Sequence, residues 1–205
     1  MTRVLVYSTS GDEALATARC IAEWTEVRLV AESHAAHLVC DIDRLTLETL
    51  VDGADGLAAF THGSKEALFD GSRRPMVDAG NVAMLTGRWA WLYACYAGHE
   101  LAGRAVHAGA VCVAGFDVPV HVDWVPETLP PGLRTDFERL VTEVPSLLAA
   151  GQYGGDEIRA AVLPLVDAIL DYCQDHQETF PPGIDITAEQ MLRRLVIRSP
   201  TVDLE

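Results

Sequence analysis

The chain has 205 residues, of which 49% are hydrophobic and 22% charged, and its formal net charge is −15. This length and composition suit one domain with a sizeable core, or one domain with a modest appendage, and they exclude a largely disordered chain. The negative charge argues against partners that require a basic surface, namely DNA, RNA and anionic membranes, and no run of about 18 apolar residues could span a membrane.

The cysteines indicate the compartment. They are odd in number and scattered without paired spacing, at Cys20, Cys40, Cys95, Cys112 and Cys173. This pattern favours free thiols in a reducing compartment, and we expect the cytoplasm. The chain begins with a strand pattern at once and lacks a basic region followed by a long apolar one, so no secretory signal is expected.

The first part of the chain alternates between strand-like and helix-like patterns. Buried strands are predicted over residues 3–7, 27–31, 57–61, 89–94 and 110–116, and helices over 13–24, 45–51, 75–85 and 100–108. Ser10 or Asp12 can cap the first helix, and Asp43 can cap the second. Residues 34–43 are ambiguous, and 65–74 look like a surface loop. The alternation predicts an α/β fold with a mainly parallel sheet and helices on both faces.

The composition changes near residue 126, where prolines at 126, 130 and 131 interrupt regular structure. We therefore divide the chain into an α/β domain over 1–126 and a helical C-terminal extension over 131–205, expected to pack on the same domain. Helical periodicity covers 133–148 and 156–174, and a last helix is predicted from about 187 to 198.

Two apolar runs end on reactive side chains. The third predicted strand leads into His62 and Gly63, and the fourth leads into Cys95. The carboxyl ends of parallel strands meet at one edge of a sheet, where α/β proteins bind their ligands. An imidazole beside a thiol can act as a base for a cysteine nucleophile. The backbone N–H groups of Gly63 and Cys95 are candidate donors to an oxyanion.

Other interpretations of these residues stay open. A cysteine is often only a small buried apolar residue, and we expect that role for Cys112, Cys20 and Cys173. His99 is a rival base, although it more naturally points to solvent. No metal site is expected, because no Cys or His pair has the close spacing of structural zinc. A glycine-rich nucleotide-binding loop is missing, and so is the Gly-x-Ser-x-Gly elbow of serine hydrolases.

The motifs at residues 60–63, 94–98 and 103–110 resemble those of caspase-like cysteine peptidases, especially the bacterial caspase-like and CHAT-type members. The resemblance covers about residues 1–118. It implies a caspase-like sheet and endopeptidase activity without a cofactor. It also implies His62 as general base and acid, Cys95 as nucleophile, and an oxyanion hole formed by the Gly63 and Cys95 amides.

The chain also departs from the animal enzymes. His62 and Cys95 are separated by 33 residues, against about 50 in animal caspases, and Tyr93 stands where their signature has a glutamine. Because the last third of the chain looks helical, the final strand of those enzymes is expected to be missing or replaced.

The expected partner is a protein or peptide substrate, with a regulatory protein as a second partner. Cleavage after a basic residue is expected, since Asp12, Asp117 and Asp123 are carboxylates that could bind arginine or lysine. Two other functions are kept open. The chain could be a catalytically inactive scaffold or protein-binding module, or it could transfer or hydrolyse a non-peptide acyl group with the same two residues.

Overall fold

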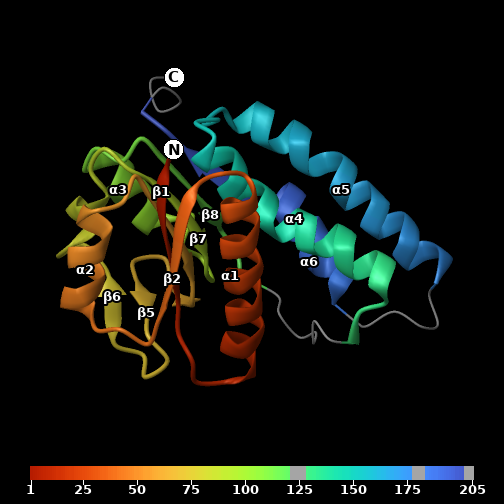
Figure 1. Ribbon diagram of the computed structural model, residues 1–205, viewed down its shortest axis with the longest axis horizontal. Coiled ribbons are helices and arrows are strands. Elements are labelled where there is room, and N and C mark those ends of the chain that lie inside the picture. The colour runs from red at the N-terminus through yellow and green to blue at the C-terminus, as the bar shows by residue number, and fades with distance from the viewer. Residues whose placement is uncertain (121–127, 177–182, 201–205) are drawn as a thin grey trace.

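The computed structural model describes residues 1–120, 128–176 and 183–200. A six-stranded sheet runs through the molecule in the order β2-β1-β3-β7-β8-β9 (Figure 1). Its strands are β1 (Arg3–Ser8), β2 (Ala35–Cys40), β3 (Gly56–Phe60), β7 (Trp89–Tyr93), β8 (Cys112–Phe116) and β9 (Leu195–Arg198). The first five are parallel to their neighbours and β9 is antiparallel to β8. The predicted α/β class with a mainly parallel sheet is confirmed.

Helices cover both faces of this sheet, as predicted. On one face lie α1 (Glu13–Ala31) and α4 (Pro131–Ala149), with α5 (Gly155–Asp175) and α6 (Ile184–Arg193) packed against α4 (Figure 1). On the other face lie α2 (Arg44–Asp52), α3 (Glu100–His107) and the 3₁₀ helix η1 (Val82–Leu85). Alternate residues of β1 supply the two cores: Val4 and Val6 enter the first, and Leu5 and Tyr7 enter the second.

A second, small sheet follows directly from the end of β3. It contains β4 (His62–Gly63), β5 (Leu68–Phe69) and β6 (Pro75–Val77), all antiparallel. The helix predicted over 75–85 is therefore wrong, and the predicted loop over 65–74 contains a short strand. Asp78 and Asn81 explain the first error. Their side chains bond to the backbone at Gly80, Asp78 and Met76, which satisfies these groups outside a helix.

The strand predicted over 27–31 is also wrong, because α1 continues to Ala31. The β-branched residues Val27 and Val30 suggested a strand, yet both are exposed while Leu29 is buried, as on one face of a helix. The strand instead forms within the ambiguous segment, as β2. Asp12 and Asp43 cap α1 and α2 through their side chains, as predicted.

The last helix is shorter than predicted. It ends at Arg193, and residues Leu195–Arg198 form β9 along the edge of β8. The final strand of the animal enzymes was expected to be missing or replaced, and the described structure has a strand, β9, in this last third of the chain. Side chains from α4, α5, α6 and β9 share one core with β1, β3, β7 and β8, so residues from 131 onward pack on the sheet itself. No helix in the described part of the chain is long and apolar enough to cross a membrane.

Candidate active site

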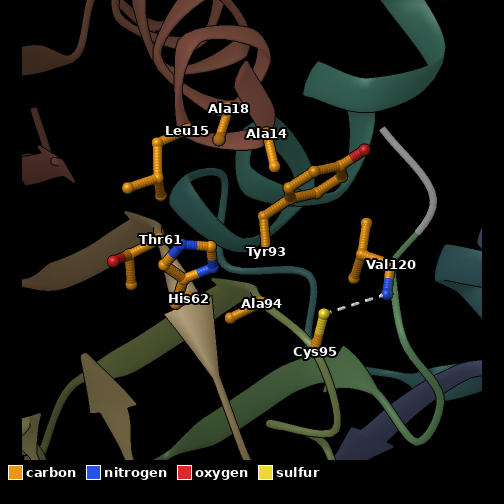
Figure 2. Close-up of a pocket in the computed structure, with 9 residues that line it drawn as sticks. All are labelled: Ala14, Leu15, Ala18, Thr61, His62, Tyr93, Ala94, Cys95 and Val120. Atoms are coloured by element: carbon orange, nitrogen blue, oxygen red, sulfur yellow. Dashed lines mark hydrogen bonds between the residues drawn. The ribbon is translucent and has the colours of Figure 1, made fainter. Parts of the chain in front are cut away.

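His62 and Cys95 lie at the same edge of the main sheet. β3 and β7 are parallel neighbours in which Phe60 is level with Tyr93, so the two residues that follow each strand emerge side by side. Both side chains line one pocket of about 220 Å³ (Figure 2). The pocket is lined by Ala14, Leu15, Ala18, Thr61, His62, Tyr93, Ala94, Cys95 and Val120.

The His62 ring is held from the side of helix α1. Its Nε2 atom lies 2.9 Å from Oδ2 of Asp12, whose other carboxylate oxygen accepts the N–H of Leu15 at 3.0 Å. The residue before it, Thr61, is buried and bonded through its hydroxyl to Thr9 and to the Phe69 carbonyl. Figure 2 shows the other ring nitrogen, Nδ1, on the Cys95 side of the ring. One nitrogen is therefore occupied and the other faces the pocket.

The Cys95 sulfur has a backbone donor. The N–H of Val120 points to it with an N···S distance of 3.3 Å (Figure 2). The sulfur of a cysteine nucleophile carries negative charge when it reacts, and this N–H lies where it can donate to that sulfur. Among the described residues no hydrogen bond joins the His62 ring to this sulfur, and the pocket occupies the space between them.

The backbones of Gly63 and Cys95 are in close contact. A Cβ atom on Gly63 would lie 2.6 Å from the Cys95 carbonyl oxygen and 2.8 Å from the Ala94 Cβ. Only glycine fits at position 63, because any side chain would collide with the Cys95 turn. The backbone angles of Gly63 do not themselves require glycine. Within the described part of the chain the Cys95 N–H donates no hydrogen bond. The backbones of the two residues expected to form the oxyanion hole therefore lie beside each other, and in the described structure the Cys95 amide is available to donate.

The turn that carries Cys95 has an unusual backbone. Tyr96 adopts a left-handed conformation with φ of 58°, and its N–H bonds to the Val118 carbonyl at 3.0 Å. For a residue with a side chain this conformation costs about 1–2 kcal/mol. Gly98 packs directly on Gly115 of β8 and donates to the Phe116 carbonyl at 2.8 Å. These contacts hold the turn against β8 and aim Cys95 at the pocket.

The remaining cysteines and His99 lie elsewhere. Cys112 and Cys173 are buried, and burial raises the pKa of their thiols to about 12 and about 11. Burial is also the main cause of the raised pKa of Cys40. His99 is exposed at the start of α3 and does not line the pocket. None of the five cysteines forms a disulfide bond.

The three carboxylates expected to bind substrate have different surroundings. Asp12 is bonded to His62, and Asp117 forms an ion pair with Arg194 at 3.1 Å, while Asp123 lies outside the described residues. The described pocket wall beside His62 and Cys95 is mostly apolar, formed by Ala14, Leu15, Ala18, Tyr93 and Val120. Of the three, only Asp12 contacts a pocket residue in the described structure.

Sequence reasoning missed two contributors to this site. The N–H of Val120 comes from a segment after β8 that no motif marks, and the pairing of Asp12 with His62 joins residues 50 positions apart. The Asp12 cap was visible in the sequence, but its second contact depends on how α1 packs beside β4. The left-handed Tyr96 has no signal in the sequence.

No group of three or more histidine, cysteine or acidic side chains in the described residues is arranged to hold a metal ion. No family model matches the chain, and no curated protein matches its sequence.

Proposed function

We propose that this protein is a cysteine endopeptidase of caspase-like type that acts through His62 and Cys95. The observation that carries the proposal is that both side chains line one pocket at the carboxyl edge of the sheet, with an amide directed at the sulfur. The His-then-Cys order along the chain and an antiparallel strand at the end of the sheet add support, because the animal enzymes that the sequence resembles also have a final strand.

The proposed reaction begins with the Cys95 thiol. It gives its proton to Nδ1 of His62, and the sulfur attacks the carbonyl carbon of the scissile peptide bond. The negative oxygen that forms is stabilised by the amides of Cys95 and Gly63. The C–N bond then breaks, His62 returns the proton to the leaving amine, and a thioester remains on Cys95. Water attacks the thioester and gives a proton to His62. The C–S bond then breaks, which releases the acid, and His62 returns the proton to the Cys95 sulfur.

The space between the His62 and Cys95 side chains suits this order of reaction steps. A scissile bond lying in the pocket would have the sulfur on one side and the imidazole on the other, so the leaving nitrogen could receive its proton directly. Catalytic contacts are commonly longer in an empty enzyme and shorten when substrate binds.

The proposal includes a protein or peptide substrate, a regulatory protein as partner, and a cytoplasmic location, which the five free thiols support. A preference for cleavage after basic residues is retained. It now depends on Asp123, since Asp117 is paired with Arg194 and Asp12 with His62. A peptide library that varies the residue before the scissile bond tests it. Faster cleavage after arginine or lysine supports a basic preference, and faster cleavage after small apolar residues shows that the apolar wall decides.

The test of the activity compares Cys95→Ala with Cys40→Ala, which removes a half-buried thiol outside the pocket. We expect Cys95→Ala to abolish cleavage of library peptides, and Cys40→Ala to leave it within about twofold, because only Cys95 lies in the pocket. Cleavage that survives in Cys95→Ala would refute the assignment.

A thiol-directed irreversible peptide probe, followed by peptide mapping, separates an enzyme from an inactive scaffold. We expect labelling of Cys95 to exceed that of Cys20 and Cys40, which are also partly exposed. Equal labelling of all three would favour the scaffold. Selective labelling without peptide cleavage would favour an enzyme that acts on a non-peptide acyl group.

A further inference from the structure

The Asp12 carboxylate has two partners, one on each oxygen. Oδ1 accepts the N–H of Leu15 and caps helix α1, and Oδ2 lies 2.9 Å from Nε2 of His62. The side chain of Asp12 is 52% exposed, whereas that of His62 is 15% exposed. The histidine is thus mostly enclosed, and one of its nitrogens is reached from the solvent side by a carboxylate.

The loop that carries Asp12 is held in place by two other loops. The N–H and the hydroxyl of Ser10 both donate to Oδ1 of Asp41, at 2.7 and 2.9 Å. Gly71 lies so close to Ser10 that a Cβ atom on it would be 1.7 Å from the Ser10 carbonyl oxygen. The loop that carries the carboxylate is therefore packed against both of these loops, and the carboxylate itself contacts α1.

A carboxylate at this position determines which nitrogen of a neutral His62 carries the proton. The Leu15 N–H, opposed by some desolvation and assisted by His62 and Arg73, holds the pKa of Asp12 below its ordinary value, so Asp12 is ionised near neutral pH. An ionised carboxylate only accepts hydrogen bonds, so the proton must be on Nε2. Nδ1, on the Cys95 side of the ring, is then left with the lone pair that a general base needs (Figure 2).

We propose that Asp12 is the positioning residue of an Asp12–His62–Cys95 relay. It orients the ring, fixes the proton on Nε2, and stabilises the imidazolium that forms when Nδ1 takes the proton of Cys95. It does not bind the substrate side chain, which was its expected role. The inference rests on the proposed function, because the relay has a purpose only if Cys95 is a nucleophile.

Two substitutions separate this role from helix capping. Asparagine and serine are both good N-caps, so Asp12→Asn and Asp12→Ser should fold with α1 intact. In Asp12→Asn the amide oxygen is needed by the Leu15 N–H, so the amide nitrogen faces His62 and donates to Nε2. The ring proton of neutral His62 is then on Nδ1. That nitrogen must be unprotonated to act as the base, so the variant has the wrong tautomer. In Asp12→Ser the side chain is too short to reach the ring.

For Asp12→Asn we expect kcat to fall on the order of 10²- to 10⁴-fold, as when a triad carboxylate elsewhere is replaced by its amide. For Asp12→Ser, which loses only orientation and charge, we expect a fall of roughly 10- to 100-fold. KM should change by less than about threefold in both, because Asp12 does not contact the substrate.

Asp43 provides the matched control. It caps α2 in the same way, with Oδ1 accepting the Thr46 N–H at 2.8 Å, but it lies outside the pocket. Asp43→Asn and Asp43→Ser should leave kcat within about twofold. If the Asp12 variants also keep kcat within twofold, or if they change KM alone, the positioning role is refuted.

A second measurement does not need turnover. Nitrogen-15 NMR of the His62 ring, at a pH where it is neutral, reports which nitrogen is protonated. We expect Nε2 to carry the proton in the wild type and Nδ1 in Asp12→Asn. A wild-type ring protonated on Nδ1 overturns the inference, even if the protein is a peptidase. The expected tautomers in a protein that cleaves nothing support the pairing while refuting the proposed activity.

Discussion

Single atoms decide how closely the β4 backbone can approach the turn that carries Cys95. Gly63 sits at the point where β4 touches the Cys95 turn, and its missing side chain leaves room for the Cys95 carbonyl oxygen. Gly103 is a useful contrast, because it lies in helix α3 and a Cβ atom there would meet nothing within 4 Å. Packing therefore requires glycine at position 63, whereas a larger side chain has room at position 103.

We expect Gly63→Ala to lower the free energy of unfolding by about 1–3 kcal/mol, the usual cost of forcing an extra carbon into a packed region. It should also reduce kcat by at least about tenfold, because β4 must move away from Cys95 and carries His62 with it. Gly103→Ala should instead raise stability by about 0.5–1 kcal/mol with kcat unchanged. Urea unfolding and peptide cleavage measure both. A Gly63→Ala protein as stable and active as the wild type would contradict the packing argument.

The two central side chains of the site could be predicted from the sequence and their surroundings could not. His62 and Cys95 each follow an apolar run, and the parallel sheet brings the ends of such runs together. Asp117 follows its strand in the same way, yet Arg194 from the far end of the chain pairs with it. No local pattern contains such a long-range contact, so the role expected for Asp117 rested on position alone.

At the scale of elements, a cluster of charged residues joins α1 to α4. Arg28 donates to Glu32 at 2.9 Å, to Glu143 at 2.7 Å and to the Thr142 hydroxyl at 3.0 Å, and Ser146 donates to Glu32 at 2.5 Å. The Arg28 and Glu143 side chains are only 23% and 15% exposed. This cluster also explains why α1 continues through residues 27–31, where a strand was predicted, because the last turn of α1 is bonded to a neighbouring helix.

We expect Arg28→Met to destabilise the protein by about 1–3 kcal/mol at neutral pH, since it leaves partly buried carboxylates without a partner. Desolvation opposes the effect, but hydrogen bonds from Ser146 and Arg28 keep the pKa of Glu32 below its ordinary value. The contribution of a group with a lowered pKa is fully present above its unfolded value of about 4.3. It is lost as the pH falls through the folded pKa, so the difference between Arg28→Met and wild type should shrink below about pH 4.

Arg19 serves as the control for that experiment. It pairs with Glu23 on the same helix, but both side chains are about half exposed, at 44% and 53%. Arg19→Met should therefore change the free energy of unfolding by less than about 0.5 kcal/mol at any pH. Denaturant titrations between about pH 3 and 7 would decide, and a pH-independent difference for Arg28→Met would count against the cluster.

Most of the other elements follow from local patterns. Apolar runs predicted β1, β3, β7 and β8, and helical periodicity predicted α2, α3, α4 and α5. The errors lie where local and tertiary preferences disagree. Leu195–Arg198 continues the pattern of α6, but the free edge of β8 offers it backbone partners, and a strand there covers that edge.

The whole molecule depends on β9 to complete the sheet. Without it, the backbone of β8 from Val113 to Phe116 would present unpaired groups at an edge. We expect a chain that ends at Arg193 to be markedly less stable and prone to aggregation, because it exposes an apolar edge strand. A chain that ends at Pro200 keeps β9 and should behave like the full chain. Thermal unfolding and light scattering compare the two, and equal behaviour would show that β9 is dispensable.

The position of β9 also makes the pocket depend on residues that are synthesised late. Arg198 donates to the Gly98 carbonyl, and Gln190 donates to the Pro119 carbonyl next to the residue that holds the Cys95 sulfur. Arg198 follows Gly98 by 100 residues, so at a synthesis rate of about 5–20 residues per second it is made roughly 5–20 s later. A nascent chain thus carries its thiol and imidazole before the contacts that frame the pocket exist, so we expect the pocket to form only after Arg198 has been made.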